Sequence, residues 1–183
     1  MNKKIVIFIS GKGSNAKNLI NYFSDNKELV ISHVFSNNKH SDLNSYLLNT
    51  KVQFFLFEEK EISGKVFDEL KKINPKLIIL AGFLKKIPPS YLSFFKNKII
   101  NIHPSLLPKF KGLNTFSRVL KNKEIKSGCT VHYVNNKLDA GHIIKSKKFF
   151  LIPSDNETTL KHKTQNLEYK AFPQAIISIF RYR

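Results

Sequence analysis

An uninterrupted run of β-branched and aromatic residues occupies positions 4–10, Lys-Ile-Val-Ile-Phe-Ile-Ser, and ends at Gly11. Because the run lacks the polar alternation of a half-exposed strand, it predicts a strand buried on both faces. Strands of this kind belong to parallel sheets covered by helices. A helix is expected next, since Ser14 and Asn15 can cap one and apolar residues recur at helical spacing over 16–23.

Strand and helix patterns continue to alternate through the first hundred residues. Further strands are predicted at 29–36, 52–57, 76–81 and 98–103, and helices at 43–48 and 66–73. Alternation of this kind predicts an α/β fold with a doubly wound, mostly parallel sheet and flanking helices.

The pattern changes after residue 127. Residues 129–134 and 143–152 alternate like paired strands, which predicts an antiparallel C-terminal portion of the sheet. A helix is expected from about Glu157, and Pro173 is expected to bend it. The length of 183 residues suits a single domain over 1–183.

Several classes of protein are excluded by the composition. The longest apolar run, 77–84, has eight residues, whereas a membrane-spanning helix needs about 18. The single cysteine, Cys129, cannot form an internal disulfide, and the sequence has no Cys-x-x-Cys pair for zinc. The apolar stretch at the N-terminus is too short for a secretory signal. We therefore expect a cytoplasmic protein without membrane association or a bound metal.

The formal net charge of +18 raises the question of a nucleic-acid partner. Lysine accounts for 28 of the 31 basic residues, and these lysines are spread along the whole chain. Dedicated nucleic-acid surfaces cluster their charge and use arginine. We interpret the charge as compositional drift towards Lys, Asn, Ile and Phe, with steering of anionic substrates as the alternative.

Gly11-Lys12-Gly13-Ser14-Asn15 lies between the first predicted strand and helix. Backbone N–H groups at a helix start can hold an anion, and glycine lets the ligand approach closely. A dinucleotide site would need an acidic residue after the second strand. The sequence has Ser36-Asn37-Asn38-Lys39 there, so a phosphate monoester fits better than NAD. The alternative is a plain turn with a helix cap.

Two polar residues, Asn101 and His103, lie at the end of the fifth predicted strand, in Asn101-Ile102-His103-Pro104. Asn101 and His103 are two residues apart in an extended strand, so their side chains share a face. Open α/β sheets bind ligands at the carboxyl ends of their strands. An amide donor beside an imidazole can stabilise an oxyanion and move a proton, which suits acyl transfer. In such a reaction we expect both Asn101 and His103 to donate to the anionic oxygen.

The run from Asn101 to Gly112 resembles the signature of the phosphoribosylglycinamide formyltransferases, and the resemblance covers nearly the whole chain in order. Shared motifs include Ile-Ser-Gly-x-Gly-Ser-Asn at 9–15, Phe-Ser-Asn at 35–37, Leu-Ala-Gly-Phe-Leu at 80–84, Val-His-Tyr-Val at 131–134, Leu-Asp-Ala-Gly at 138–141 and Glu-x-x-x-Phe-Pro at 168–173. The resemblance implies the formyltransferase fold. It also implies formyl transfer from 10-formyltetrahydrofolate to the amino group of glycinamide ribonucleotide in de novo purine biosynthesis.

The same resemblance implies roles for individual residues. Asn101, His103 and Asp139 match the catalytic trio, and His132 matches a residue that supports the catalytic aspartate. Taken without the resemblance, His132 could equally make a cross-strand hydrogen bond and Asp139 could be a turn residue. Cys129 is not needed as a nucleophile, because the amine attacks the formyl carbon directly.

Binding residues are also implied. Gly13, Ser14 and Asn15 match the phosphate loop, and Glu168 matches a carboxylate that contacts the sugar, although alone it would be a solvated helix charge. The expected folate pocket is formed by Leu84, Lys85, Ile87, Asn136 and Asp139. The folate is a co-substrate, and the expected assembly is a monomer or homodimer.

Two positions depart from the family pattern: Lys85 stands where many relatives carry arginine, and Phe116 where histidine is common. These changes concern local hydrogen bonding more than the reaction. The chain also ends soon after the last predicted helix, which is expected to affect stability or oligomer contacts.

Three alternatives remain open. A methionyl-tRNA formyltransferase would share the catalytic trio, but that family usually adds a C-terminal RNA-binding barrel and lacks the Gly-x-Gly-Ser-Asn loop. Formyltetrahydrofolate hydrolases usually carry an extra N-terminal domain. A non-catalytic basic nucleic-acid-binding domain would explain the lysines, but it leaves Asn101, His103 and Asp139 without a role.

Overall fold

The computed structural model describes residues 2–39 and 43–181. These residues form two compact units, one up to Ile100 and one from Asn101 onward. A single domain over 1–183 stays a prediction.

The first unit contains parallel strands and the helices that connect them. Its strands are β1 (Lys3–Ile9), β2 (Leu29–Ser36), β3 (Gln53–Leu56) and β4 (Leu77–Leu80). β1 pairs in parallel with β2 and β4, and β2 pairs in parallel with β3. The helices are α1 (Ser14–Tyr22), α2 (Leu43–Leu47), α3 (Phe67–Ile73) and α4 (Pro89–Phe94), with short helical turns η1 (Glu59–Glu61) and η2 (Ile62–Val66) before α3.

The core of this unit is built around β1. Residues Ile5 to Ile9 have no exposed surface, which confirms the prediction of a strand buried on both faces. The Phe8 ring stacks on Phe35 with centroids 5.0 Å apart and meets Phe83 edge-on at 5.4 Å. Because Phe83 is itself buried, this aromatic contact anchors the segment that follows β4.

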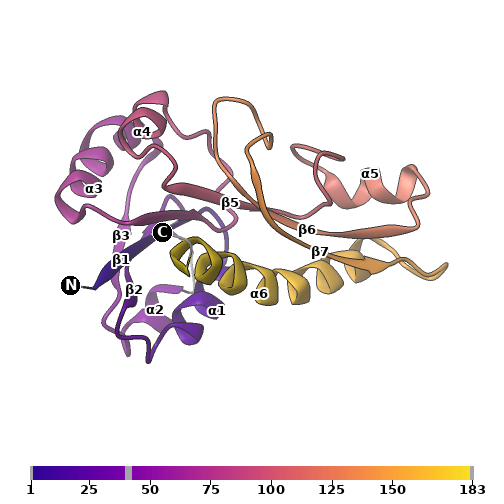
Figure 1. The fold of residues 1–183 in the computed structure, drawn as a ribbon, viewed down its shortest axis with the longest axis horizontal. Helices are drawn as coiled ribbons and strands as arrows, with labels where there is room; N and C mark the ends of the chain where they lie inside the picture. The colour runs from indigo at the N-terminus through magenta and orange to yellow at the C-terminus, as the bar shows by residue number, and fades with distance from the viewer. Residues whose placement is uncertain (1, 40–42, 182–183) are drawn as a thin grey trace. The chain divides into compact units, whose positions relative to one another are not determined.

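The second unit contains the antiparallel portion of the sheet. β5 (Ile99–His103) lies at the boundary between the units, and β6 (Lys126–Tyr133) pairs antiparallel with β7 (Ile143–Phe150). α5 (Thr115–Lys121) precedes β6. α6 (Glu157–Arg181) lies along β6 and β7 (Figure 1) and continues as one helix through Pro173.

The strand order is β3-β2-β1-β4-β5-β6-β7 in one seven-stranded sheet. The prediction of a mostly parallel, doubly wound sheet with an antiparallel C-terminal part is confirmed, and its strands lie within three residues of their predicted bounds. Two short helices, α4 and α5, were not predicted, although α2 and α3 are of similar length.

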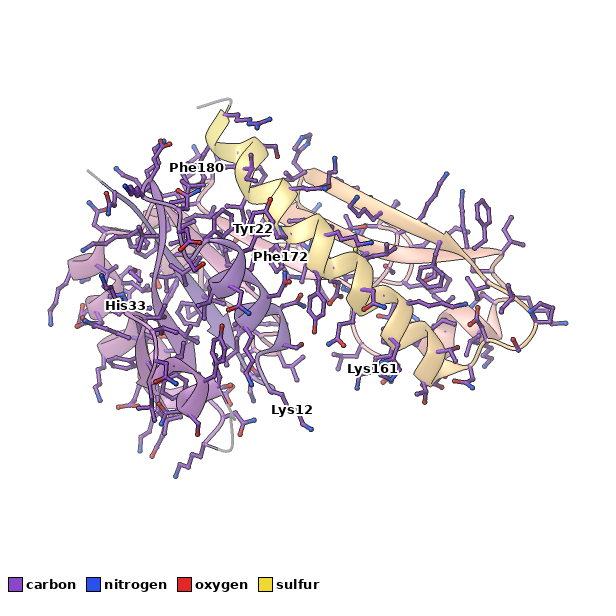
Figure 2. The ribbon with its side chains drawn as sticks, turned by 90° about the horizontal axis from the view of Figure 1, so that it is seen from below. Lys12, Tyr22, His33, Lys161, Phe172 and Phe180 are labelled. Carbon is purple, nitrogen blue, oxygen red and sulfur yellow. The ribbon has the colours of Figure 1, made fainter. Side chains whose placement is uncertain are left out.

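The lysines that dominate the charge lie mainly on the surface. Lys12, before α1, and Lys161, on α6, are exposed (Figure 2). Within residues 2–39 and 43–181, no helix combines the length and apolar character that crossing a membrane requires.

Candidate active site

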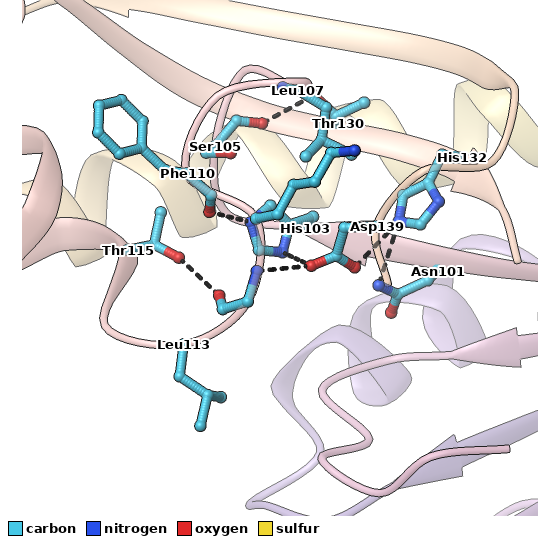
Figure 3. A network of polar contacts seen from close by, with 12 residues as sticks. Asn101, His103, Ser105, Leu107, Phe110, Leu113, Thr115, Thr130, His132 and Asp139 are labelled. Carbon is cyan, nitrogen blue, oxygen red and sulfur yellow. Dashed lines mark hydrogen bonds and ion pairs between the residues drawn. The ribbon is translucent and has the colours of Figure 1, made fainter. Parts of the chain in front are cut away.

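Asn101 and His103 come from β5, and their side chains reach one polar cluster (Figure 3). The Asn101 amide nitrogen lies 3.3 Å from His132 Nε2, and His103 Nδ1 lies 3.2 Å from Asp139 Oδ2. Asp139 Oδ1 is in turn 3.6 Å from His132 Nε2. Four side chains separated by up to 38 positions in the sequence therefore meet at one place.

Asp139 reaches this cluster through an unusual backbone. It lies in the connection between β6 and β7, and its φ of 46° places it in the left-handed region that aspartate tolerates better than most residues. Gly141 closes the connection, because a Cβ there would lie 1.6 Å from the Tyr133 carbonyl oxygen. The Asp-Ala-Gly motif thus has a physical reason. Glycine at position 141 lets the chain pass close to Tyr133, and this path places the Asp139 carboxylate in the cluster.

Both ring nitrogens of His103 face acceptors. Nε2 donates to the Phe110 carbonyl oxygen at 2.8 Å, and a carbonyl can only accept, so Nε2 carries a proton. Nδ1 faces the Asp139 carboxylate, which also accepts a hydrogen bond from the Gly112 N–H at 2.8 Å. A second proton arriving on the ring would therefore be held between Nδ1 and Oδ2.

His132 is fixed in the same manner. Its Nδ1 donates to the Tyr133 carbonyl oxygen at 2.9 Å, and its Nε2 faces both the Asn101 amide and the Asp139 carboxylate. Nε2 therefore accepts the amide N–H when the ring is neutral and donates to the carboxylate when the ring is protonated. The second amide N–H of Asn101 is not used by this contact. The arrangement orients one amide donor and one imidazole around Asp139.

Burial and pairing set the ionisation of the two central groups. Burial lowers the pKa of His103, although the Phe110 carbonyl and Asp139 oppose this effect. Burial raises the pKa of Asp139, but contacts with His132, the Gly112 N–H and His103 outweigh it and bring the pKa to about 2. Near neutral pH the site therefore holds a carboxylate beside a neutral imidazole, which is a pair ready to accept a proton.

This ionisation predicts a pH dependence of stability. A histidine whose pKa is lower in the folded state binds protons more readily when unfolded, so stability falls as the pH drops from about 6.5 through the folded pKa. One such group contributes at most about 1.4 kcal/mol per pH unit. Urea unfolding of the wild type and of His103→Gln between about pH 7.5 and 5 should show a shallower decline in the variant. If the unfolding free energy depended on pH equally in the two proteins, the lowered pKa of His103 would be contradicted.

The loop after β5 is held by Thr130 of β6. Thr130 Oγ1 donates to the Ser105 carbonyl oxygen at 2.7 Å and accepts from the Leu107 N–H at 3.1 Å, while Ser105 Oγ donates to the Lys109 carbonyl oxygen at 2.6 Å. The buried hydroxyls thus replace backbone pairing in the loop that leads to Phe110.

The predicted phosphate loop lies in the first unit, at the start of α1. Gly13 has a φ of 75°, and a Cβ there would lie 3.1 Å from Leu43 Cδ2, so both conformation and space favour glycine. Ser14 is the first residue of α1 and Asn15 is buried behind it. The loop therefore ends at the N-terminus of α1, and its role as an anion cradle stays a prediction.

The predicted folate segment is tied to that loop within the same unit. The Leu84 N–H donates to Ser10 Oγ at 3.0 Å, and the Ser10 N–H donates to the Gly82 carbonyl oxygen at 3.1 Å. Leu84 is 71% exposed, Ile87 is half-buried, and Lys85 pairs with Glu59 at 2.7 Å. Backbone hydrogen bonds thus hold in place a segment whose side chains are largely exposed.

The remaining predicted binding residues lie in the second unit. Asn136 is exposed in the connection between β6 and β7, and Glu168 is half-buried on α6. Burial, with the charge of Glu168 adding to it, raises the pKa of the Cys129 thiol to about 12. Such a thiol stays protonated near neutral pH, so its chemistry agrees with the prediction that Cys129 is not a nucleophile.

Sequence reasoning missed the backbone groups that hold the site. The Phe110 carbonyl fixes His103, and the Gly112 N–H fixes Asp139. Backbone contacts leave no residue-type signal, and in the sequence Gly112 is only the last residue of the run from Asn101. Among the described residues, no group of three or more His, Cys, Asp or Glu side chains is placed to hold a metal ion.

Comparison with known proteins gives consistent results. A family model described as "Formyl transferase" matches residues 3–176. The chain is 33% identical over 181 residues to a phosphoribosylglycinamide formyltransferase of Haemophilus influenzae, covering 95% of this chain and 85% of that protein. It is 30% identical over 179 residues to the enzyme of that name from Escherichia coli strain K12, covering 94% and 84%.

The fold is likewise similar to a solved structure. A phosphoribosylglycinamide formyltransferase from Anaplasma phagocytophilum superposes with a TM-score of 0.90 at 33% identity, covering 96% of this chain and 86% of that one. The predicted formyltransferase fold is therefore confirmed.

Proposed function

The chain belongs to the formyl transferase family, and from this premise we propose that it transfers the formyl group of 10-formyltetrahydrofolate to the amino group of glycinamide ribonucleotide in purine biosynthesis. The relatives named phosphoribosylglycinamide formyltransferase support this substrate pair. The folate is a co-substrate that supplies the formyl group.

One observation in the chain itself carries the proposal: the cluster of Asn101, His103, His132 and Asp139. It combines an amide donor, a carboxylate and a neutral imidazole in a site where the central side chains are less than a tenth exposed. Formyl transfer to an amine needs these functions, because the carbonyl oxygen becomes anionic and a proton must leave the attacking nitrogen.

Asp139 and His103 handle the proton in this proposal. As the substrate nitrogen attacks the formyl carbon it becomes positive, and its proton passes to the space between Asp139 Oδ2 and His103 Nδ1, directly or through water. The protonated pair then returns the proton to the folate nitrogen as the carbon–nitrogen bond to it breaks. No covalent bond to the protein is required.

Asn101 stabilises the anionic oxygen. One of its amide N–H groups is oriented by His132, and the second can donate to the oxygen that gains charge. His103 contributes its positive charge once it has taken up the proton, because both of its nitrogens already face protein acceptors. This assignment differs from the expectation that His103 donates directly to the oxygen.

The two substrates are assigned to different segments. Gly13, Ser14 and Asn15 hold the ribonucleotide phosphate through the N-terminus of α1, and Glu168 contacts the sugar. Leu84, Lys85 and Ile87 of the first unit and Asn136 and Asp139 of the second are assigned to folate binding. The hydrogen bond from the Leu84 N–H to Ser10 Oγ supports the assignment of the first-unit residues, because it joins the phosphate loop to the folate segment.

The decisive assay supplies purified protein with 10-formyltetrahydrofolate and either glycinamide ribonucleotide or its dephosphorylated riboside. We expect formylation of the ribonucleotide, with a far higher KM for the riboside. Ser14→Ala should raise KM for the ribonucleotide but leave KM for the riboside nearly unchanged. Formylation of methionyl-tRNA in place of the ribonucleotide would contradict the proposal and favour the tRNA-modifying alternative.

Surface lysines are expected to attract the anionic substrates. Four lysines follow the 80–84 motif or lie within 101–112. Lys109 pairs with Glu124 and Lys85 with Glu59, whereas Lys86 and Lys111 have no ion pair among the described residues. Raising ionic strength from about 0.02 to about 0.3 M should lower kcat/KM about tenfold and kcat less than about twofold.

A matched pair of variants tests this steering. Lys111→Ala should reduce kcat/KM at low salt more than Lys109→Ala, because Glu124 already neutralises Lys109 at 2.8 Å. Equal salt effects on kcat and kcat/KM would contradict steering.

A further inference from the structure

The loop that holds the catalytic pair has a strained backbone. Phe110, Gly112 and Asn114 have φ values of 57°, 79° and 55°, so every second residue over 110–114 adopts the left-handed region. For Phe110 this conformation is uncommon, whereas asparagine adopts it more readily, and a bulky residue persists there only where surrounding contacts fix it. This loop supplies the Phe110 carbonyl to His103 and the Gly112 N–H to Asp139.

Arg118 of α5 binds this loop from outside the catalytic cluster. Its Nη1 donates to the Lys111 carbonyl oxygen at 2.6 Å and to the Leu113 carbonyl oxygen at 3.3 Å. Its guanidinium carbon lies 5.6 Å from the centre of the Phe110 ring. The side chain therefore contacts residues on both sides of Gly112 and the residue whose carbonyl orients His103.

We infer that Arg118 is a positioning residue: it holds the strained loop 110–114 in the conformation that presents the Phe110 carbonyl to His103 and the Gly112 N–H to Asp139. Thr115 supports the same loop, since its Oγ1 donates to the Gly112 carbonyl oxygen at 3.2 Å. Arg118 differs because it joins the two carbonyls that flank Gly112 and covers Phe110.

The residue type supports this role. Arginine occurs three times in a chain with 28 lysines, so an arginine at position 118 stands out against the composition. A guanidinium can donate to several carbonyls in one plane and lie over an aromatic ring, whereas a lysine ammonium is a compact point charge. The contacts of Arg118 with two carbonyls and the Phe110 ring match these properties.

The inference deepens the proposed function and rests on it for its kinetic test. Arg118→Ala should lower kcat about tenfold or more, with a smaller change in KM, because a small displacement of His103 and Asp139 affects the reaction more than substrate binding. Arg118→Lys should give an intermediate kcat, since an ammonium can donate to a loop carbonyl but does not cover the Phe110 ring as a planar guanidinium does. Lys121→Ala is the matched control, because it removes an equal exposed charge from α5 and should keep wild-type kcat.

A second readout needs no substrate and separates this inference from the proposed reaction. In protein labelled with ¹⁵N-histidine, the His103 Nε2–H signal should exchange with water faster in Arg118→Ala than in the wild type or Lys121→Ala. A slower formyl transfer together with faster exchange would support the positioning role. Wild-type kcat and wild-type exchange in Arg118→Ala would overturn it, as would an equal loss in Lys121→Ala. If the wild type formylated no ribonucleotide, the proposed function would fail while the exchange experiment still tested the loop.

Discussion

Replacing Asp139 with asparagine should lower kcat by about 10³-fold, within the range that positioned acid–base groups contribute. Asparagine has the shape of aspartate, so its oxygen can still accept the Gly112 N–H that holds this side chain. It cannot hold the proton that the attacking amine must lose. The proton would then have to pass to solvent, because His103 has no carboxylate beside it.

The fold should survive this substitution with a modest loss of stability. The pKa of Asp139 lies at about 2, below the ordinary 3.8, so its ionised form stabilises the folded state above that range and the stabilisation is lost as the pH falls towards 2. The neutral variant lacks this contribution, and urea unfolding at pH 7 should show a slightly lower midpoint. Asp68→Asn is the control, since Asp68 is an exposed partner of Lys71 on α3. Wild-type turnover by the Asp139 variant would refute the role given to this carboxylate.

The local elements could be predicted from sequence because each depends on short-range patterns. The run at 4–10 predicted β1, whose residues Ile5 to Ile9 are fully buried. The spacing of Asn101 and His103 predicted a shared face, and both side chains do reach one cluster. α4 and α5 were not predicted, although the similarly short α2 and α3 were, and α5 carries Arg118.

The convergence of the site could not be predicted from residue patterns alone. Asp139 reaches His103 because the chain turns through a left-handed residue and then passes so close to Tyr133 that position 141 has no room for a Cβ. Such a path depends on backbone geometry, which the hydrophobic periodicity and the composition of the sequence do not reveal. Only the resemblance to a family connected Asp139 with Asn101 and His103, and it gave no indication that Phe110 and Gly112 hold the pair through backbone groups.

Asn101→Ala is the second substitution with a large expected effect. Removing one donor to an anionic oxygen lowers kcat by about 10² to 10³-fold in enzymes that use such donors. Asn101 is half-buried on β5, and alanine creates no steric conflict there, so the loss should appear in turnover more than in stability. Asn26→Ala is a suitable control, because Asn26 caps a turn at Leu29 in the other unit and lies far from Asn101 in the sequence.

Asn101→Ala could lower kcat in two physically different ways, because Asn101 contacts His132 and is also proposed to donate to the oxyanion. If it acted only by orienting His132, then adding Asn101→Ala to a His132→Ala protein would cause no further loss. If it donates to the oxyanion, the double variant should lose a further factor of about 10². We expect the second result, because one amide N–H satisfies His132 and the other remains for the substrate. A double-variant kcat equal to that of His132→Ala would reduce Asn101 to a positioning residue and leave the oxyanion without its amide donor.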